Sequence, residues 1–244
     1  MKKFLLLFLL TGFLWSCSSD DDSVEDEPNN TAILPVKITY SDSDMYSEIL
    51  VSYDGKKISK MNMNIQGMGN MEGVYQYDGD KITKITTTMG DEVSTTTYTY
   101  ANNRLATANV VWEGVGTTEY IYEWINDNHV KLKTVDSSRI TEFYLENGNI
   151  VKVFDNFGGS DWIHNYTFDN KNRPFRNVEG FQYLIEEDDL HSFNINNVVK
   201  EVINAGSNTY VTDYSYEYNA QGFPTKQIVN SEEENSTYTF TYNQ

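Results

Sequence analysis

The chain has 244 residues and a formal charge of −18, from 36 acidic and 18 basic side chains. That charge excludes a general affinity for nucleic acid, because binding to phosphate depends on Lys and Arg. The single Cys excludes an internal disulfide and a Cys-based zinc site, while 18 Tyr, 12 Phe and 4 Trp with only 4 Pro favour β-structure over disorder.

Residues 1–16 have the pattern of a secretory signal peptide. Two Lys precede Phe4–Leu14, a run that is apolar at all but two positions. Its eleven residues would span about 17 Å as a helix, short of the ~30 Å bilayer core, so a permanent transmembrane helix is not expected. Cys17 follows this run and resembles the lipobox Cys of bacterial lipoproteins, which implies its acylation and a lipid anchor in the outer membrane. The alternative is an ordinary secretory signal with an unmodified Cys.

Residues 17–30 are interpreted as the lipidated Cys and an acidic flexible tether. Six of the thirteen residues after Cys17 are acidic and one is aliphatic, so they cannot form a core. As a coil the tether has a reach of roughly 20 Å. The cluster of Ser19, Asp20, Asp21 and Asp22 resembles the surface-export signal of lipoproteins from Bacteroidota-type bacteria, which implies exposure on the cell surface. The alternative is a solvated spacer.

Residues 31–244 are expected to form a single β-repeat domain, because one motif recurs along them. An aromatic residue is followed by an Asp, Asn or Gly turn and then by an aliphatic residue or Pro; Tyr53–Lys60 is nearly restated at Tyr77–Lys84. Looser copies begin at Tyr100, Trp124, Tyr144, Phe168, Phe193, Tyr218 and Tyr242. Each unit has a second turn, such as Gly180 in the unit that begins at Phe168, which leaves two strands per unit. We therefore predict an antiparallel meander of about 16–18 strands from eight hairpin repeats of ~24 residues.

The strands before the first turns alternate aromatic and polar residues, so one face of the sheet is aromatic. This candidate ladder, which forms either a packed core or a binding surface, consists of Tyr98, Tyr100, Tyr120, Tyr122, Trp124, Tyr214, Tyr216, Tyr218, Tyr238 and Phe240. So many strands should curl into a flattened or spiral barrel-like sheet with the rings inside, its two walls ~10 Å apart. A round barrel would leave a lumen too wide for side chains to fill. A transmembrane barrel of porin type is disfavoured because outward residues such as Thr97, Glu217 and Thr239 supply no apolar belt.

The repeats, with Tyr53-Asp54-Gly55 and Phe168–Pro174 as examples, resemble the YD or RHS-like repeats of bacterial surface and toxin proteins. Together with the leader they resemble a family of Bacteroidota outer-membrane lipoproteins built from such repeats. The resemblance covers residues 31–244. It implies the architecture and transfers no catalytic residue.

One stretch departs from the pattern. Glu186–Ser192 contains four consecutive acidic residues. It is interpreted as an edge loop kept soluble by charge, with a cation-binding or recognition loop as the alternative.

Catalytic and metal chemistry is not predicted. His129, His164 and His191 fall in different units without the spacing of a zinc pair. Asp161 lies three residues from His164 and therefore on the opposite face of a strand. Asp80, Asp91, Asp127 and Asp169 occupy turns, where side-chain hydrogen bonds to the backbone account for them. The sequence thus predicts no enzyme activity, no metal and no cofactor.

Two classes of function remain. The first is a lipid-anchored cell-surface module, binding or structural, that captures a glycan or a surface protein through its aromatic residues. The second is a carrier, facing the periplasm or the surface, that holds a lipophilic ligand in the cavity of the curled sheet. Tyr is the commonest inward residue and would fill such a cavity with phenols, which favours the first.

Overall fold

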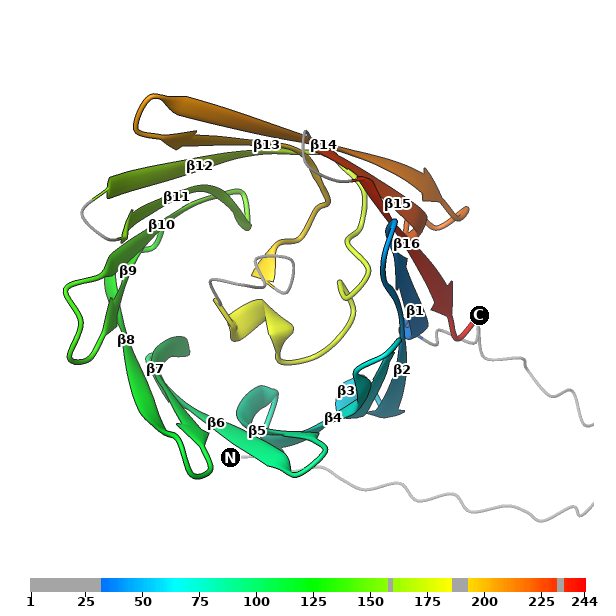
Figure 1. The fold of residues 1–244 in the computed structure, drawn as a ribbon, viewed down its shortest axis with the longest axis horizontal. Helices are drawn as coiled ribbons and strands as arrows, with labels where there is room; N and C mark the ends of the chain where they lie inside the picture. Colours follow the sequence, from blue (N-terminus) through cyan, green and yellow to red (C-terminus); the bar gives the residue numbers. More distant parts are fainter. Residues whose placement is uncertain (1–31, 158–159, 186–192, 232–234) are drawn as a thin grey trace, which may run out of the picture. The chain divides into compact units, whose positions relative to one another are not determined.

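A computed structural model describes residues 32–157, 160–185, 193–231 and 235–244. Within them, sixteen strands form one antiparallel sheet that closes into a barrel, each strand pairing with its sequence neighbours and β1 with β16 (Figure 1). The strands are β1 (Pro35–Ser41), β2 (Tyr46–Asp54), β3 (Lys57–Ile65), β4 (Gly69–Asp78), β5 (Lys81–Met89), β6 (Glu92–Ala101), β7 (Arg104–Trp112), β8 (Gly116–Asn126), β9 (His129–Thr134), β10 (Ile140–Glu146), β11 (Asn149–Phe157), β12 (Ser160–Phe168), β13 (Val198–Ala205), β14 (Asn208–Tyr218), β15 (Pro224–Ser231) and β16 (Asn235–Tyr242). The predicted all-β meander and its barrel-like closure are confirmed. No helix in these ranges is long and apolar enough to cross a membrane.

The first turns of the repeats have the backbone that their sequences predict. Gly55 and Gly79 have positive φ, and at Asn102-Asn103 and Asn147-Gly148 both turn residues do. Each of these hairpins also contains a register shift beside its aromatic residue. Ser52 pairs with Lys60, for example, whereas Tyr53 pairs with Ile58. In β2–β3, β4–β5 and β6–β7 the extra residue places both the aromatic ring and the aliphatic residue after the turn on the inward face. In β10–β11 the inward residue at this place is Leu145, and Tyr144 stacks on His129 on the outer face.

All first turns lie at one end of the barrel, which we call the proximal end. Pro35 opens β1 beside Tyr242 of β16, so the chain also enters and leaves the barrel there. The opposite end, which carries the second turns, is the distal end. At the proximal end the inward residues that open the strands form a ring with almost no exposed surface: Pro35, Ile58, Ile82, Leu105, Val130, Ile150, Val198 and Pro224.

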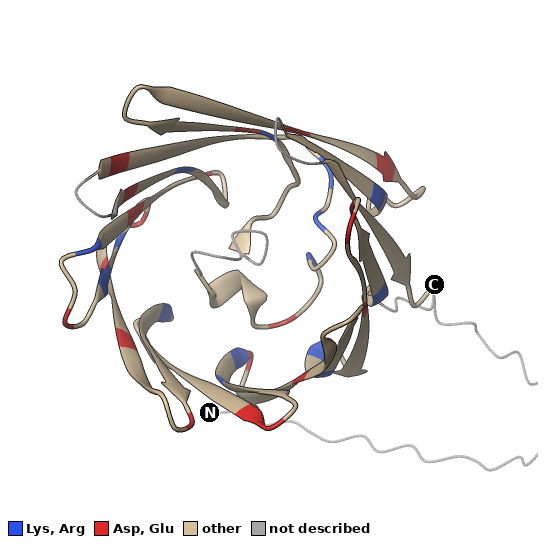
Figure 2. Cartoon of the chain, in the orientation of Figure 1, with Lys and Arg blue, Asp and Glu red and all other residues tan. Residues whose placement is uncertain are grey.

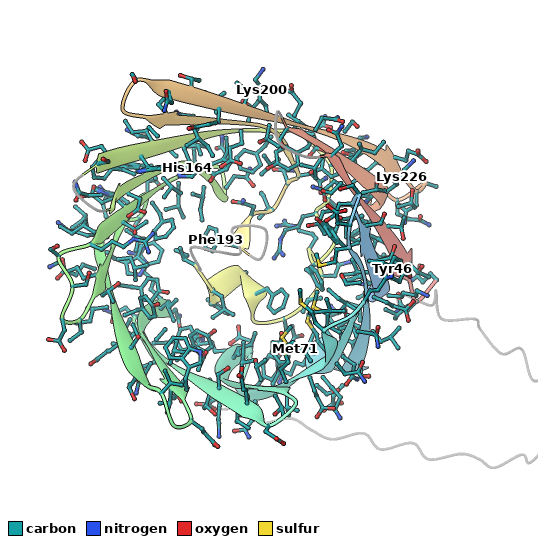
Figure 3. All side chains as sticks on the ribbon, viewed as in Figure 1. Tyr46, Met71, His164, Phe193, Lys200 and Lys226 are labelled. Carbon is teal, nitrogen blue, oxygen red and sulfur yellow. The ribbon has the colours of Figure 1, made fainter. Side chains whose placement is uncertain are left out.

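A segment inside the barrel completes the core at this end. The chain between β12 and β13 has two described parts, residues 169–185 and 193–197, which lie in the interior of the ring of strands and are here called the lumen segment (Figure 1). Its buried apolar residues are Val178, Phe181, Leu184 and Ile185, and they belong to the same cluster as Ile58, Ile82 and Tyr98 of the wall. Figure 3 shows Phe193 on the lumen side of the wall, and it packs against the same cluster.

The lumen segment corrects two expectations. The unit that begins at Phe168 was predicted to be a hairpin with its second turn at Gly180, yet it contains the 3₁₀ helix η1 (Phe181–Tyr183) instead of a strand pair. Its apolar residues recur every third position and not every second, which suits turns and not strands.

The two walls also do not approach each other as in a sandwich. The principal contacts of each strand are with its sheet neighbours, and the lumen segment occupies space between the walls.

The outer wall is polar. Thr97, Glu123, Glu217 and Thr239 are exposed outward residues, as expected. Ion pairs cross neighbouring strands on this face, including Lys37 with Glu48 at 2.5 Å and Lys133 with Glu123 at 2.5 Å. Figure 2 shows acidic and basic residues distributed around the ring of strands, and Figure 3 shows Lys200 and Lys226 on its outside. Exposed apolar residues such as Leu50, Val74 and Val111 lie on separate strands. In the described wall, the outward face thus lacks the continuous apolar belt that contact with lipid requires.

Candidate functional site

Several aromatic residues of the repeat form hydrogen bonds within the wall of the barrel. The side chains of Tyr53, Tyr100, Tyr216 and Tyr242 each donate a hydrogen bond of 2.7 Å to a backbone oxygen 18 residues earlier, at Pro35, Ile82, Val198 and Pro224 respectively. Trp124 Nε1 donates likewise to the Leu105 oxygen at 3.0 Å. Every acceptor belongs to the ring of residues that opens the strands. In these five cases an aromatic side chain with a polar atom binds the beginning of the preceding repeat, which gives the recurring Tyr or Trp a structural role.

The structure places all ten candidate ladder residues on the inward side. Tyr98, Tyr122 and Phe240 are buried in the core, and Tyr100, Tyr120, Trp124 and Tyr238 pack against it half-buried. Tyr214 donates to Glu201, Tyr216 to Val198 and Tyr218 to Asp169. Burial raises the pKa of Tyr214, Tyr216 and Tyr218, and the nearby carboxylates raise it further, so these phenols stay neutral. As a set the rings form the interior of the barrel and not an exposed row.

Trp124 also lines a pocket where the lumen segment meets the wall at the proximal end. The pocket has a volume of about 320 Å³, within the range of small-molecule sites. Its apolar surface comes from Leu105, Trp124, Leu145, Tyr183 and Phe193. Its polar groups are those of Asn103, Arg104, Asp127, Asn128, Glu146 and Gln182.

Charged groups organise one side of this proximal pocket. The Arg104 guanidinium lies 4.6 Å from the centre of the Trp124 ring and donates to Asp127 Oδ1 at 2.5 Å. The Asp127 carboxylate is thus the ion-pair partner of Arg104. The turn is capped by Asn126 instead, whose side-chain oxygen accepts a hydrogen bond from the Asn128 backbone amide at 2.8 Å. This corrects the interpretation of Asp127 as a turn residue alone.

Tyr183 of η1 also lines the pocket and is held by charged groups of its own. Its hydroxyl donates to Asp80 Oδ2 at 2.5 Å, and the Lys81 ammonium lies 4.7 Å from its ring centre. Hydrogen bonds from Tyr183 and Lys81 lower the pKa of the Asp80 carboxyl. Asp80 is therefore also more than a turn residue, because it connects the β4–β5 turn to the lumen segment.

A second polar group faces the lumen between β12, β13 and β14. His164 Nδ1 lies 2.9 Å from Glu201 Oε1, and Tyr214 donates to Glu201 Oε2 at 3.2 Å. Burial alone would raise the pKa of Glu201, but hydrogen bonds from His164 and Tyr166 outweigh it and hold the pKa below its ordinary value. Sequence reasoning placed Asp161 and His164 on opposite faces but did not find Glu201. Nothing near His164 in the chain indicates this partner, which lies 37 residues away.

The other predicted residues are placed as follows. His129 lies on the outer wall with Glu142, at 2.8 Å, so it and His164 are on opposite faces of the sheet. His191 and Glu186–Asp189 lie outside the described residues. Cys17 and the cluster Ser19, Asp20, Asp21 and Asp22 do so as well. The part of the chain that the structure describes contains no group of three or more His, Cys, Asp or Glu residues that could hold a metal ion.

Comparison with solved structures identifies barrels of similar fold. A porin-like protein from Bacteroides vulgatus superimposes with a TM-score of 0.59 at 14% identity, over 87% of this chain and 99% of the other. A porin-like protein from Bacteroides uniformis has a TM-score of 0.53 at 12% identity, over 86% and 96% of the two chains. The shared feature is the fold. No family model and no curated protein matches the sequence.

Proposed function

We propose that this protein is a lipid-anchored, non-enzymatic binding module of the bacterial cell surface, and that the proximal pocket binds a saccharide. The observation that carries the ligand class is the composition of the pocket. Aromatic rings at Trp124, Tyr183 and Phe193 lie beside planar polar groups, among them those of Arg104 and Asp127. Rings that contact the apolar faces of a sugar, with amide, carboxylate and guanidinium groups for its hydroxyls, are the chemistry that saccharide recognition requires.

Two features support the proposed lipid anchor and surface location: the N-terminal residues 1–30 and the polar outer wall of the barrel. The acyl chains of a modified Cys17 would hold the protein at the membrane without help from the barrel. A polar outer face suits a barrel that stands in water at the end of the tether. The resemblance to RHS-like repeats and the porin-like folds from Bacteroides are consistent with an outer-membrane protein of Bacteroidota type.

The alternative of a lipophilic carrier receives less support. The lumen space at the proximal end, where a ligand would be most protected from water, is filled by Phe181, Leu184 and Ile185 of the chain itself. A pocket rich in charged and amide groups also suits a polar ligand better than an acyl chain.

The test of the ligand is a glycan array with the full chain, followed by calorimetric titration of the best ligand. Arg104→Ala should weaken binding at least tenfold, because Arg104 both covers Trp124 and positions Asp127. Lys133→Ala is the matched control, since Lys133 is a similarly exposed base in a 2.5 Å ion pair remote from the pocket. Absence of any bound glycan, or equal affinity of the two variants, would contradict the proposal.

The test of display is protease treatment of intact cells. Replacing Asp20, Asp21 and Asp22 by Ala should protect the protein from external protease without lowering its total amount. If the two strains are cleaved equally, the acidic residues act only as a spacer.

A further inference from the structure

The methionine residues of this protein gather on three neighbouring strands. Of the seven in the chain, Met61 and Met63 lie in β3, Met71 in β4 and Met89 in β5. All four lie on the inward face. Met61 pairs with the buried Val51, and Met63 is two residues further along the same strand. Met71 is directly opposite Met63, and Met89 is directly opposite Met71, so both share that face. Figure 3 shows Met71 on the inner side of the wall.

Three of these residues form a row across the strands. Met63 is directly opposite Met71, and Met71 is directly opposite Met89. Directly opposed residues have Cβ atoms about 4.5 to 5.5 Å apart, and the concave inner side of a closed barrel brings neighbouring side chains closer still. The three thioether groups are therefore within reach of one another.

Space is left around the middle member of this row. The inward residues before and after Met71 on β4 are Gly69 and Gly73, which have no side chain. A Cβ atom added at Gly69 would meet no heavy atom within 4 Å, and one at Gly73 would meet only Tyr75, at 3.6 Å. The positions on both sides of Met71 therefore hold no side chain and leave room beside it, which is not the environment of a tightly packed core residue.

Solvent also reaches the row. Met63, Met71 and Met89 are only half-buried, although each of their strands has a paired neighbour on both sides. At the proximal end, by contrast, Ile58 and Ile82 on the same inward face are fully buried. Since inward side chains of a closed barrel can be exposed only toward the lumen, the distal half of the lumen admits water here. Met89 also lines a pocket of about 370 Å³ at this end, together with Thr87, Ser94 and Trp112.

We propose that Met63, Met71 and Met89 form a binding site for a soft monovalent cation, Cu(I). Thioether sulfur is a soft, uncharged ligand that selects Cu(I) and contributes little to binding of hard divalent cations. Up to three sulfur atoms are available from one row, and all three side chains are half-buried on the inward face. The charge of −18 produces a potential that favours a cation over an anion at an opening of the barrel. Met61 is the nearest additional sulfur, although it already accepts a hydrogen bond from Tyr75, at 3.3 Å.

The test is a titration of the full chain with Cu(I) against a chromophoric Cu(I) chelator, in a Cys17→Ser background so that no thiol competes. The protein should take one equivalent of Cu(I) from the chelator, and a large excess of Ca²⁺ should not displace it. Met71→Leu should weaken binding at least tenfold. Met68→Leu is the matched control, because Met68 lies exposed in the turn between the same strands. Leu conserves the volume of Met, so both variants should fold.

Methyl NMR gives a second measurement of the same claim. On addition of Cu(I), the εCH₃ signals of Met63, Met71 and Met89 should shift, while that of Met68 should not. Three results would overturn the proposal: failure of the protein to compete with the chelator, equal affinity of Met71→Leu and Met68→Leu, or Cu(I)-induced shifts confined to methionines outside the row.

Discussion

Gly180 is the position where the contact between lumen segment and wall can be tested most sharply. Its backbone has φ +97° and ψ −37°, outside the regions that side chains favour. A Cβ atom there would lie 2.7 Å from Ile82 Cγ1 and 3.0 Å from Tyr77 Cε1. Gly180→Ala therefore adds a clash between the segment and the wall to the cost of a positive φ. Gly206→Ala is the matched control, because Gly206 has φ +60° and nothing within 4 Å of its added Cβ.

The size of the effect follows from these two contributions. An L-residue in the left-handed region costs about 1 to 2 kcal/mol, and both variants bear this cost. Overpacking adds about 1 to 3 kcal/mol at Gly180 alone. In a domain of this size 1 kcal/mol lowers Tm by about 2 to 4 °C, so Gly180→Ala should melt about 2 to 12 °C below Gly206→Ala.

Circular dichroism melts of the two variants and the unmodified chain provide the assay. Limited proteolysis adds an independent measurement, because a displaced lumen segment should become susceptible at Arg173, which is buried in the native barrel. Equal melting temperatures for the two variants, with equal protection of Arg173, would refute the close packing of the lumen segment against β4 and β5.

Two further predictions concern the interior of the wall. Tyr216→Ala should lower the free energy of unfolding by about 3 to 5 kcal/mol, because the ring lies inward and its hydroxyl donates to the Val198 oxygen. Glu217→Ala on the outer wall should change it by no more than about 0.5 kcal/mol. Equal melting temperatures for the two variants would contradict the inward assignment of Tyr216. Glu201 has a pKa held below its ordinary value of 4.5, so the stabilisation by its carboxylate is present above that pH and is lost as the pH falls through the lowered pKa. Glu201→Gln should therefore lower Tm at pH 7 and have a smaller effect once the pH has fallen below that lowered pKa. A Tm difference that stays the same throughout an acid titration would argue against the His164–Glu201 interaction.

The extent to which the sequence predicts this fold differs along the chain. Strand pairs such as β2–β3 and β4–β5 follow directly from the sequence, because Tyr53-Asp54-Gly55 and Tyr77-Asp78-Gly79 combine alternation with turn residues that accept positive φ. Phe168-Asp169-Asn170 begins in the same way but leads into the lumen. The difference lies in the residues that follow, where apolar side chains recur every third position, and a motif at the beginning of the unit does not contain that information.

Some sites combine residues from before and after the lumen segment, or from the segment and the wall, and these could not be predicted from the sequence. Glu201 meets His164 only because β12 and β13 pair after the chain has passed through the interior. The proximal pocket likewise combines wall turns with Gln182, Tyr183 and Phe193. Trp124 was identified as a candidate from its place in the repeat, while Arg104 and Asp127 became visible as its partners only in the folded barrel.

We propose that this barrel, with its polar outer wall and a segment of its own in the lumen, is attached to the membrane through a lipid at Cys17. The most direct measurement is the behaviour of the full chain carrying Cys17→Ser, isolated without detergent and tested for folding and for conductance in planar bilayers. We expect a soluble β-rich protein with a cooperative melt and no conductance. Aggregation that only detergent prevents, together with channel activity in the bilayer, would contradict it.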